Sequence, residues 1–234
     1  VAKKTTKGDV KGLAISAVKS ESATFQILPF VWQTGGDLND YATSGATALA
    51  YLRGLIDDGS MSEAVSNYTQ EDARTQFITG KSAMMINGPW ELSTLAKDAQ
   101  FDWDVAPLPK DKRAATSMGG ENVVVMNGAK QSDAAVKLAK FLTSAEGAKI
   151  YCDGSGQLSS RPDLQGKLKL SNDAKLKVFE SQLADAHARA YGKDYPKISE
   201  AIQLSMQEAL TGASTPEAAA KKAADSINPL LPKK

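Results

Sequence analysis

The chain has 234 residues, of which 42% are hydrophobic and 24% charged, a composition typical of a globular protein with one large or two small domains. Its net charge of +1 argues against electrostatic binding of nucleic acid or of an anionic membrane surface. The single cysteine, Cys152, excludes an internal disulfide, and with the single histidine, His187, it is too few for a Cys/His zinc site. We therefore expect neither a metal nor a cofactor.

The first part of the chain alternates short apolar stretches with helical patterns. Residues 1–8 are typical of the last turns of a helix, and because a natural chain seldom begins there, we expect a truncated N-terminus. Residues 11–18 predict a strand and residues 19–24 a polar loop. Residues 25–33, which contain a proline, predict the opening of a helix or an irregular buried turn. Apolar residues at spacings of three and four predict a helix over residues 44–58.

Residues 77–90 (FITGKSAMMINGPW) are the stretch around which we expect the chain to be organised. Gly80 suits the left-handed position that follows a helix, and the short apolar run 82–86 before Asn-Gly predicts a buried strand. Pro89 suits the first position of a new helix. This order places Trp90 at the carboxyl end of a core strand, where α/β sheets bind ligands. The alternative is a core tryptophan that closes a strand–helix joint.

The second part of the chain becomes progressively richer in helices. Residues 102–107 alternate in polarity and residues 123–126 are apolar, and both predict strands. Helices are predicted over residues 132–142 with Ser132 as N-cap, and over residues 146–151, 172–187, 195–210 and 215–227. Strands alternating with helices, followed by a helix-rich end, favour an α/β layered architecture.

Several motifs in this order resemble the bacterial extracellular solute-binding proteins of the maltose-binding type. The resemblance covers nearly the whole chain, and it depends on the order of the motifs rather than on any one of them. They are the glycine pair before Asp37, the run LIDDG at residues 55–59, the stretch from Phe77 to Trp90, VAPLP at residues 105–109, the second glycine pair at residues 119–120, and the alanine-rich helix at residues 134–142.

The resemblance implies an α/β fold of the type II periplasmic-binding-protein class, with a mixed sheet flanked by helices and a helix-rich C-terminal part. Residues 1–117 would be the first part of the C-terminal lobe. Residues 118–165 would return to an N-terminal lobe that is mostly missing, and residues 166–234 would be the closing helices of the C-terminal lobe. The returning segment would then have an uncovered apolar face, which we expect to repack, to dimerise or to become mobile.

The resemblance also implies ligand contacts. Trp90 matches a tryptophan on which sugars stack in the family, and Phe25 precedes the first glycine pair where an aromatic contact is common. The remaining candidates are the crossing residues Gly119, Gly120, Glu121 and Asn122, together with Trp32, Arg161 and Tyr195. Each has a plainer alternative: a core aromatic residue for Phe25 and Trp32, a turn for the glycine pair, a surface arginine for Arg161, and a packing residue at a helix start for Tyr195. A neutral sugar needs such aromatic faces together with hydrogen-bonding groups.

The function implied is the carbohydrate-binding subunit of an ABC importer, which takes up a mono- or oligosaccharide between two lobes and delivers it to permease subunits. The location implied is extracellular or periplasmic, as a membrane-anchored lipoprotein or a free protein. Two alternatives remain open: a carboxylate-based sugar-processing enzyme and a sugar receptor for a sensor kinase. The carboxylate-based enzyme is disfavoured because the sequence lacks a polar acid–base pair at strand ends. A Ser–His or Cys–His nucleophile is disfavoured because His187, on a polar alanine-rich segment, reads as a solvated residue and Cys152 has no basic neighbour.

Overall fold

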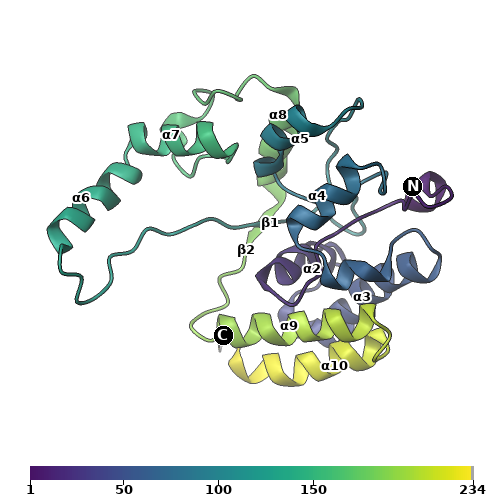
Figure 1. The fold of residues 1–234 in the computed structure, drawn as a ribbon. Coiled ribbons are helices and arrows are strands. Elements are labelled where there is room, and N and C mark those ends of the chain that lie inside the picture. Colours follow the sequence, from purple (N-terminus) through teal and green to yellow (C-terminus); the bar gives the residue numbers. More distant parts are fainter. Residues whose placement is uncertain (233–234) are drawn as a thin grey trace. The chain divides into compact units, whose positions relative to one another are not determined.

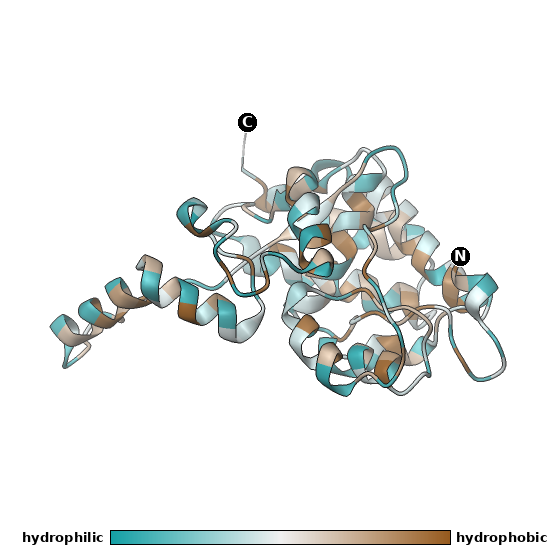
Figure 2. Ribbon diagram, turned by 90° about the horizontal axis from the view of Figure 1, so that it is seen from above, coloured by the Kyte–Doolittle hydropathy of each residue, from teal (hydrophilic) through white to brown (hydrophobic). Residues whose placement is uncertain are grey.

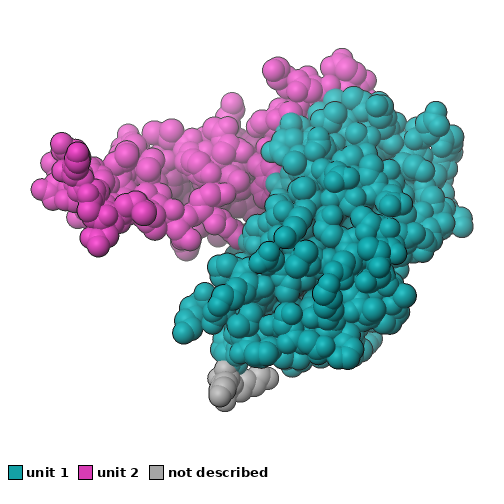
Figure 3. Space-filling model, turned by 60° about the horizontal axis from the view of Figure 1, so that its bottom comes forward, with its two compact units in different colours: residues 1–87, 108–118, 184–234 teal, residues 88–107, 119–183 magenta. Residues whose placement is uncertain are grey.

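Two structural units, each built from separate stretches of sequence, make up the computed structural model, which describes residues 1–232. Unit 1 contains Val1–Asn87, Leu108–Met118 and Ala184–Lys234, and unit 2 contains Gly88–Pro107 and Gly119–Leu183 (Figure 3). The chain therefore passes between the units four times. The boundary at Met118 lies next to the predicted one at residue 117, whereas the assignment of residues 118–165 to a second lobe stays a prediction.

Unit 1 is a helical layer around one apolar core. Its longer helices are α2 (Glu21–Gln33), α3 (Tyr41–Asp57), α4 (Gln70–Ile78), α9 (Tyr195–Leu210) and α10 (Pro216–Ile227). A short helix, α1 (Ala2–Thr5), precedes them. α9 and α10 run side by side and both pack on α3, while α2 packs on α3 and α9 (Figure 1). The core is formed mainly by Ile27, Leu28, Trp32, Leu49, Leu52, Ile198, Ile202, Met206, Ala220 and Ala224.

The start and end signals of these helices act largely as predicted. Thr69 caps α4 in a capping box with Asp72, and Gly80 follows that helix with φ of +70°. The hydroxyl of Thr215 accepts a hydrogen bond from the N–H of Ala218, which caps α10. The predicted loop at residues 19–24 is wrong, because Ser20 caps α2 and the helix begins at Glu21. Pro29 is tolerated inside α2, on the buried side.

The sheet of the described residues is small. β1 (Thr116–Met118) and β2 (Ala186–Ala188) pair in parallel, with Ser117 opposite His187. The stretches predicted as strands at residues 11–18 and 82–86 meet only through isolated parallel bridges, Lys11 with Ser82 and Ala14 with Met85. The strands predicted at residues 102–107 and 123–126 are wrong, because neither stretch has a ladder partner among residues 1–232.

Unit 2 contains the helices α5 (Leu92–Asp98), α6 (Ser132–Leu142), α7 (Ala145–Ser155) and α8 (Ala174–Gln182). Ser132 is the first residue of α6 and not its N-cap, which is Gln131. α6 has no buried residue, and hydrophobic and hydrophilic residues mix along it (Figure 2). Its Leu138 side chain is 57% exposed, and in the preceding stretch Val124 is 71% exposed. This apolar surface of residues 123–142 is the one that the sequence predicted to lack a cover.

Candidate ligand-binding site

Phe25 and Tyr195, two of the predicted ligand contacts, lie together in unit 1 around Arg189. Phe25 comes from α2 and Tyr195 from the first position of α9. The Arg189 guanidinium lies 4.6 Å from the centroid of the Phe25 ring, in cation–π geometry. Its Nε donates to the Tyr195 hydroxyl at 2.9 Å. We call Glu21, Phe25, Arg189, Tyr195 and Ser199 the Arg189 cluster.

Glu21 is the charge partner within the Arg189 cluster. Its Oε1 accepts a 2.9 Å hydrogen bond from Nε of Arg189 and another from the Tyr195 hydroxyl, and its Oε2 accepts from Ser199. Burial and the hydrogen bond to the Glu21 carboxylate raise the pKa of Tyr195 to about 12, although Arg189 acts in the opposite direction. Tyr195 is therefore a neutral donor at physiological pH. The cluster combines aromatic faces with charged hydrogen-bonding groups, the two features that a carbohydrate site needs.

β1 is joined to the Arg189 cluster by two hydrogen bonds. The Ser117 hydroxyl donates to the Phe25 carbonyl at 2.8 Å, and Nη1 of Arg189 donates to the Met118 carbonyl at 3.1 Å. Met118 is the last residue of unit 1 before the chain passes into unit 2. Phe25 and Arg189 are thus hydrogen-bonded to β1, whose last residue, Met118, ends this stretch of unit 1.

Trp32 lies in the core of unit 1, which favours the core alternative over a ligand contact. Its side chain is 0% exposed, and its Nε1 donates to Asp37 Oδ1 and to the Tyr191 hydroxyl, both at 3.1 Å. Burial, followed by the hydrogen bond to Asp37, raises the pKa of Tyr191 above its usual range. The Trp32 ring also stacks on His187, with centroids 4.8 Å apart. In this arrangement the indole offers no free face to a ligand.

His187 therefore departs from the prediction. It lies in β2 and stacks on an aromatic residue, whereas the sequence predicted a solvated histidine on a helix. In residues 184–191 (ADAHARAY), alanine alternates with polar or aromatic residues, which is the pattern of a strand with a period of two. Reading this pattern as a strand would also have put His187, Arg189 and Tyr191 on one side, and so would have identified Arg189.

Trp90 belongs to unit 2, in the 3-10 helix Pro89–Glu91 that precedes α5. It is half-buried, so it is not enclosed in a core. A β-carbon at Gly88 would lie 2.1 Å from its ring, so only glycine fits against the indole. Gly156, which ends α7 with φ of +72°, lies against the backbone of Pro89 and Trp90. Two glycines thus set the place of this ring, and its role as a sugar platform stays a prediction.

The crossing residues Gly119, Gly120, Glu121 and Asn122 are exposed and follow β1 without joining a helix or strand. Glu121 lies close enough to Tyr151 that its charge and hydrogen bond, after burial, raise the pKa of that tyrosine. Arg161 is occupied within unit 2, because its Nε and Nη2 both lie 3.0 Å from the Asp163 carboxylate and its Nη1 donates to the Thr143 carbonyl. That pair holds the pKa of Asp163 below its usual range.

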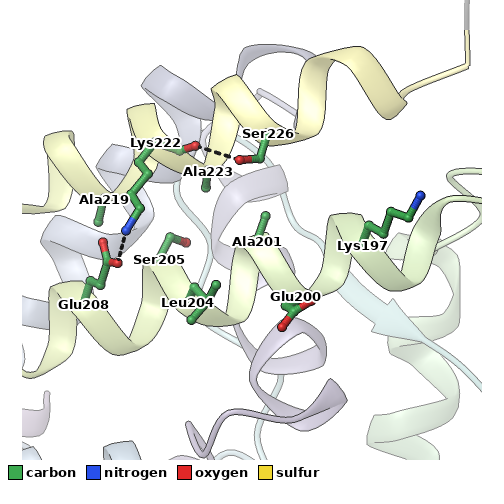
Figure 4. A pocket seen from close by; sticks show the side chains of 10 residues that line it. All are labelled: Lys197, Glu200, Ala201, Leu204, Ser205, Glu208, Ala219, Lys222, Ala223 and Ser226. Atoms are coloured by element: carbon green, nitrogen blue, oxygen red, sulfur yellow. Dashed lines mark hydrogen bonds and ion pairs between the residues drawn. The ribbon is translucent and has the colours of Figure 1, made fainter.

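A groove in unit 1 contains none of these residues. It has a volume of about 190 Å³ and lies between α9 and α10 (Figure 4). Its lining is alanine-rich and flanked by the ion pair of Lys222 with Glu208. Among residues 1–232, no three histidine, cysteine, aspartate or glutamate side chains are grouped so that they could hold a metal ion. Every helix in that range is too short or too polar to span a lipid bilayer.

Proteins of known structure share this fold. The maltose-bound MalE3 protein of T. maritima is 28% identical with a TM-score of 0.87, over 98% of this chain and 63% of that protein. A solute-binding protein of Thermotoga lettingae bound with α-D-tagatose is 31% identical with a TM-score of 0.84, over 99% of this chain and 62% of that protein. These similarities confirm the predicted type II periplasmic-binding-protein fold.

Curated relatives point to the same group. A binding protein of Brucella abortus is 26% identical over 213 residues, so this chain spans about half of it, 52%. A maltooligosaccharide ABC transporter solute-binding lipoprotein of Streptococcus pneumoniae is 31% identical over 103 residues, which are 43% of this chain and 24% of that protein. The family model for bacterial extracellular solute-binding proteins matches residues 1–178, and the chain therefore belongs to that family.

Proposed function

We propose that the chain is part of the carbohydrate-binding subunit of an ABC importer. The protein would capture a mono- or oligosaccharide in a cleft between two lobes and deliver it to permease subunits in the membrane. Relatives support this ligand class, since the similar structures include proteins bound to maltose and to α-D-tagatose, and a streptococcal relative is named for maltooligosaccharide. Membership of a solute-binding family also confirms the expectation of a binding protein rather than an enzyme.

The observation that carries the proposal is the Arg189 cluster. Phe25 and Tyr195 supply aromatic surface for the C–H faces of a sugar, and Glu21, whose side chain is 47% exposed, supplies a carboxylate for its hydroxyls. Within unit 2, taken by itself, the proposed ligand contacts are Trp90, as an aromatic platform, and Glu121, as a carboxylate. Neutral sugars are bound by such combinations of flat apolar surface and strong hydrogen-bond acceptors.

The family description supports an extracellular or periplasmic location, and the streptococcal relative supports a lipid anchor. The partners proposed are the sugar and the permease subunits. Within this scheme, residues 118–165 belong to the second lobe, and their uncovered apolar surface predicts self-association of the chain when it is studied alone.

Isothermal titration calorimetry of the natural protein that contains this sequence, against a panel of neutral oligosaccharides, tests the proposal. Stacking on Trp90 would bury on the order of 50–100 Å² of apolar surface, or ~1–3 kcal/mol at ~25 cal/mol per Å². Trp90→Ala should therefore raise the dissociation constant by roughly five- to a hundredfold.

Trp103→Ala is the matched control, because Trp103 is also a half-buried tryptophan of unit 2, but its ring is covered by Lys175 at 4.8 Å. We expect the dissociation constant of the Trp103→Ala variant to stay within about twofold of that of the natural protein. An unchanged affinity for Trp90→Ala would remove that residue from the site. A natural protein that binds no sugar of the panel would refute the proposed function.

A further inference from the structure

Arg189 occupies a position that joins several elements of unit 1. Its Nε reaches Glu21 Oε1 and the Tyr195 hydroxyl, both at 2.9 Å, and its Nη1 reaches the Met118 carbonyl at 3.1 Å. Its guanidinium plane covers the ring of Phe25 at 4.6 Å. One side chain thus contacts α2, β1 and α9, and only 15% of it is exposed.

These contacts require an arginine. A planar guanidinium can donate in different directions from Nε and Nη1 while its flat face lies on an aromatic ring, whereas a lysine ammonium is a single point of charge. Glu21 neutralises the charge, so the largely buried guanidinium is not left unpaired. The arrangement places one guanidinium in contact with two half-buried aromatic side chains, Phe25 and Tyr195.

We propose that Arg189 is a positioning residue of the ligand site, which holds Phe25 and Tyr195 in their binding geometry and ties both to the end of β1. The inference rests on the proposed function and deepens it. Its consequence is affinity, because side chains that are ordered before the ligand arrives need not be immobilised on binding. Arg189 acts through Phe25 and Tyr195 and makes no contact with the sugar itself.

Removing Arg189 leaves the fold largely supported. Glu21 keeps the hydroxyls of Tyr195 and Ser199 as donors, and with 47% of its side chain exposed it remains in contact with water. The Phe25 carbonyl keeps the Ser117 hydroxyl as donor. Arg189→Met and the more conservative Arg189→Lys should therefore fold, while the two aromatic rings lose their common support.

Arg53 offers a matched control in the same unit. It is 25% exposed, its Nε donates to Asp57 at 2.8 Å, and its Nη1 donates to the Leu210 carbonyl at 2.9 Å. It therefore pairs with one carboxylate and one main-chain carbonyl, as Arg189 does, and it lies in α3, away from the Arg189 cluster. Arg53→Met measures what the loss of such contacts costs the fold alone.

The experiment is a double-mutant cycle on the natural protein, with sugar affinity measured by calorimetry and stability by thermal unfolding. Arg189→Met should raise the dissociation constant by about tenfold or more, and Arg189→Lys should recover little of it, while Tm falls no further than for Arg53→Met. In a Phe25→Leu background the same Arg189→Met change should cost less than about threefold, since the ring that it positions is gone.

A loss below about threefold in the natural background would overturn the proposal. So would an equal loss in both backgrounds, because Arg189 would then act independently of Phe25, one of the two rings that the proposal has it hold. A natural protein that binds sugar yet tolerates Arg189→Met would refute this inference and leave the proposed function standing. A natural protein that binds no sugar would refute both.

Discussion

Replacement of Trp32 by phenylalanine should destabilise the protein without weakening sugar binding. The indole is fully buried, so the change removes about three buried ring atoms at ~0.8 kcal/mol each. It also removes the N–H that donates to Asp37 and Tyr191, at ~0.5–1.5 kcal/mol. Asp37 Oδ1 keeps the Tyr191 hydroxyl and the N–H of Leu38 as donors, so the carboxylate is not orphaned. The expected loss in the free energy of unfolding is about 3–4 kcal/mol.

Urea unfolding followed by far-ultraviolet circular dichroism measures this loss, and a thermal scan should show a fall in Tm of roughly 6–16 °C for a chain of this size. Tyr51→Phe is the control, because Tyr51 is 50% exposed and its change should stay within about 0.5 kcal/mol. Sugar affinity of the folded Trp32→Phe variant should remain within about twofold. A variant that keeps its stability and loses sugar affinity about tenfold would place Trp32 at the ligand and refute the reasoning.

Three further outcomes are expected. The free energy of unfolding should fall as the pH rises from 10 towards about 12. Burial raises the pKa of Tyr195 to about 12 and raises those of Tyr41 and Tyr191 further, so the folded state holds these protons more tightly than the unfolded state. A urea midpoint that is the same at about pH 9 and about pH 11 would contradict this prediction. Thr215→Ala should cost about 1 kcal/mol by removing the N-cap of α10, whereas Ser214→Ala should have little effect on the urea midpoint. The chain alone should sediment faster as its concentration rises, and Leu138→Glu should reduce this effect; a mass independent of concentration would argue against self-association.

Local signals predicted most helices of unit 1 because the sequence of each of these helices contains residues that mark its start or its end. α4 has its capping box and Gly80, and α10 has Thr215 followed by a proline. The strands were harder to predict because a strand needs a partner. Residues 123–126 are apolar enough for a buried strand, yet no other described segment supplies them with a ladder or a cover. An apolar run is thus necessary for a buried strand and is not sufficient.

The candidate site was predictable where a residue matches a family motif and not where it depends on long-range partners. Phe25 and Tyr195 were found by resemblance, and the structure brings them together. Arg189 was missed because its carboxylate partner, Glu21, lies 168 positions away in the sequence. The residue type of Trp32 makes it a candidate, and only the packing of the core shows that its ring is enclosed. Residue type suggests chemistry, whereas tertiary contacts decide accessibility.

The division of unit 1 into three stretches of sequence has a consequence for biosynthesis. The apolar face of α3 is covered largely by α10, which begins at Pro216 and is therefore synthesised long after α3. At a synthesis rate of ~5–20 residues per second, the apolar face of α3 stays uncovered by α10 for roughly 10–30 s. During this interval the nascent chain exposes Leu49 and Leu52, which makes it a natural client for chaperones that hold unfolded polypeptides. A ribosome stalled before α10 should therefore carry a chain that is sensitive to protease, even though most of its helices have already been made.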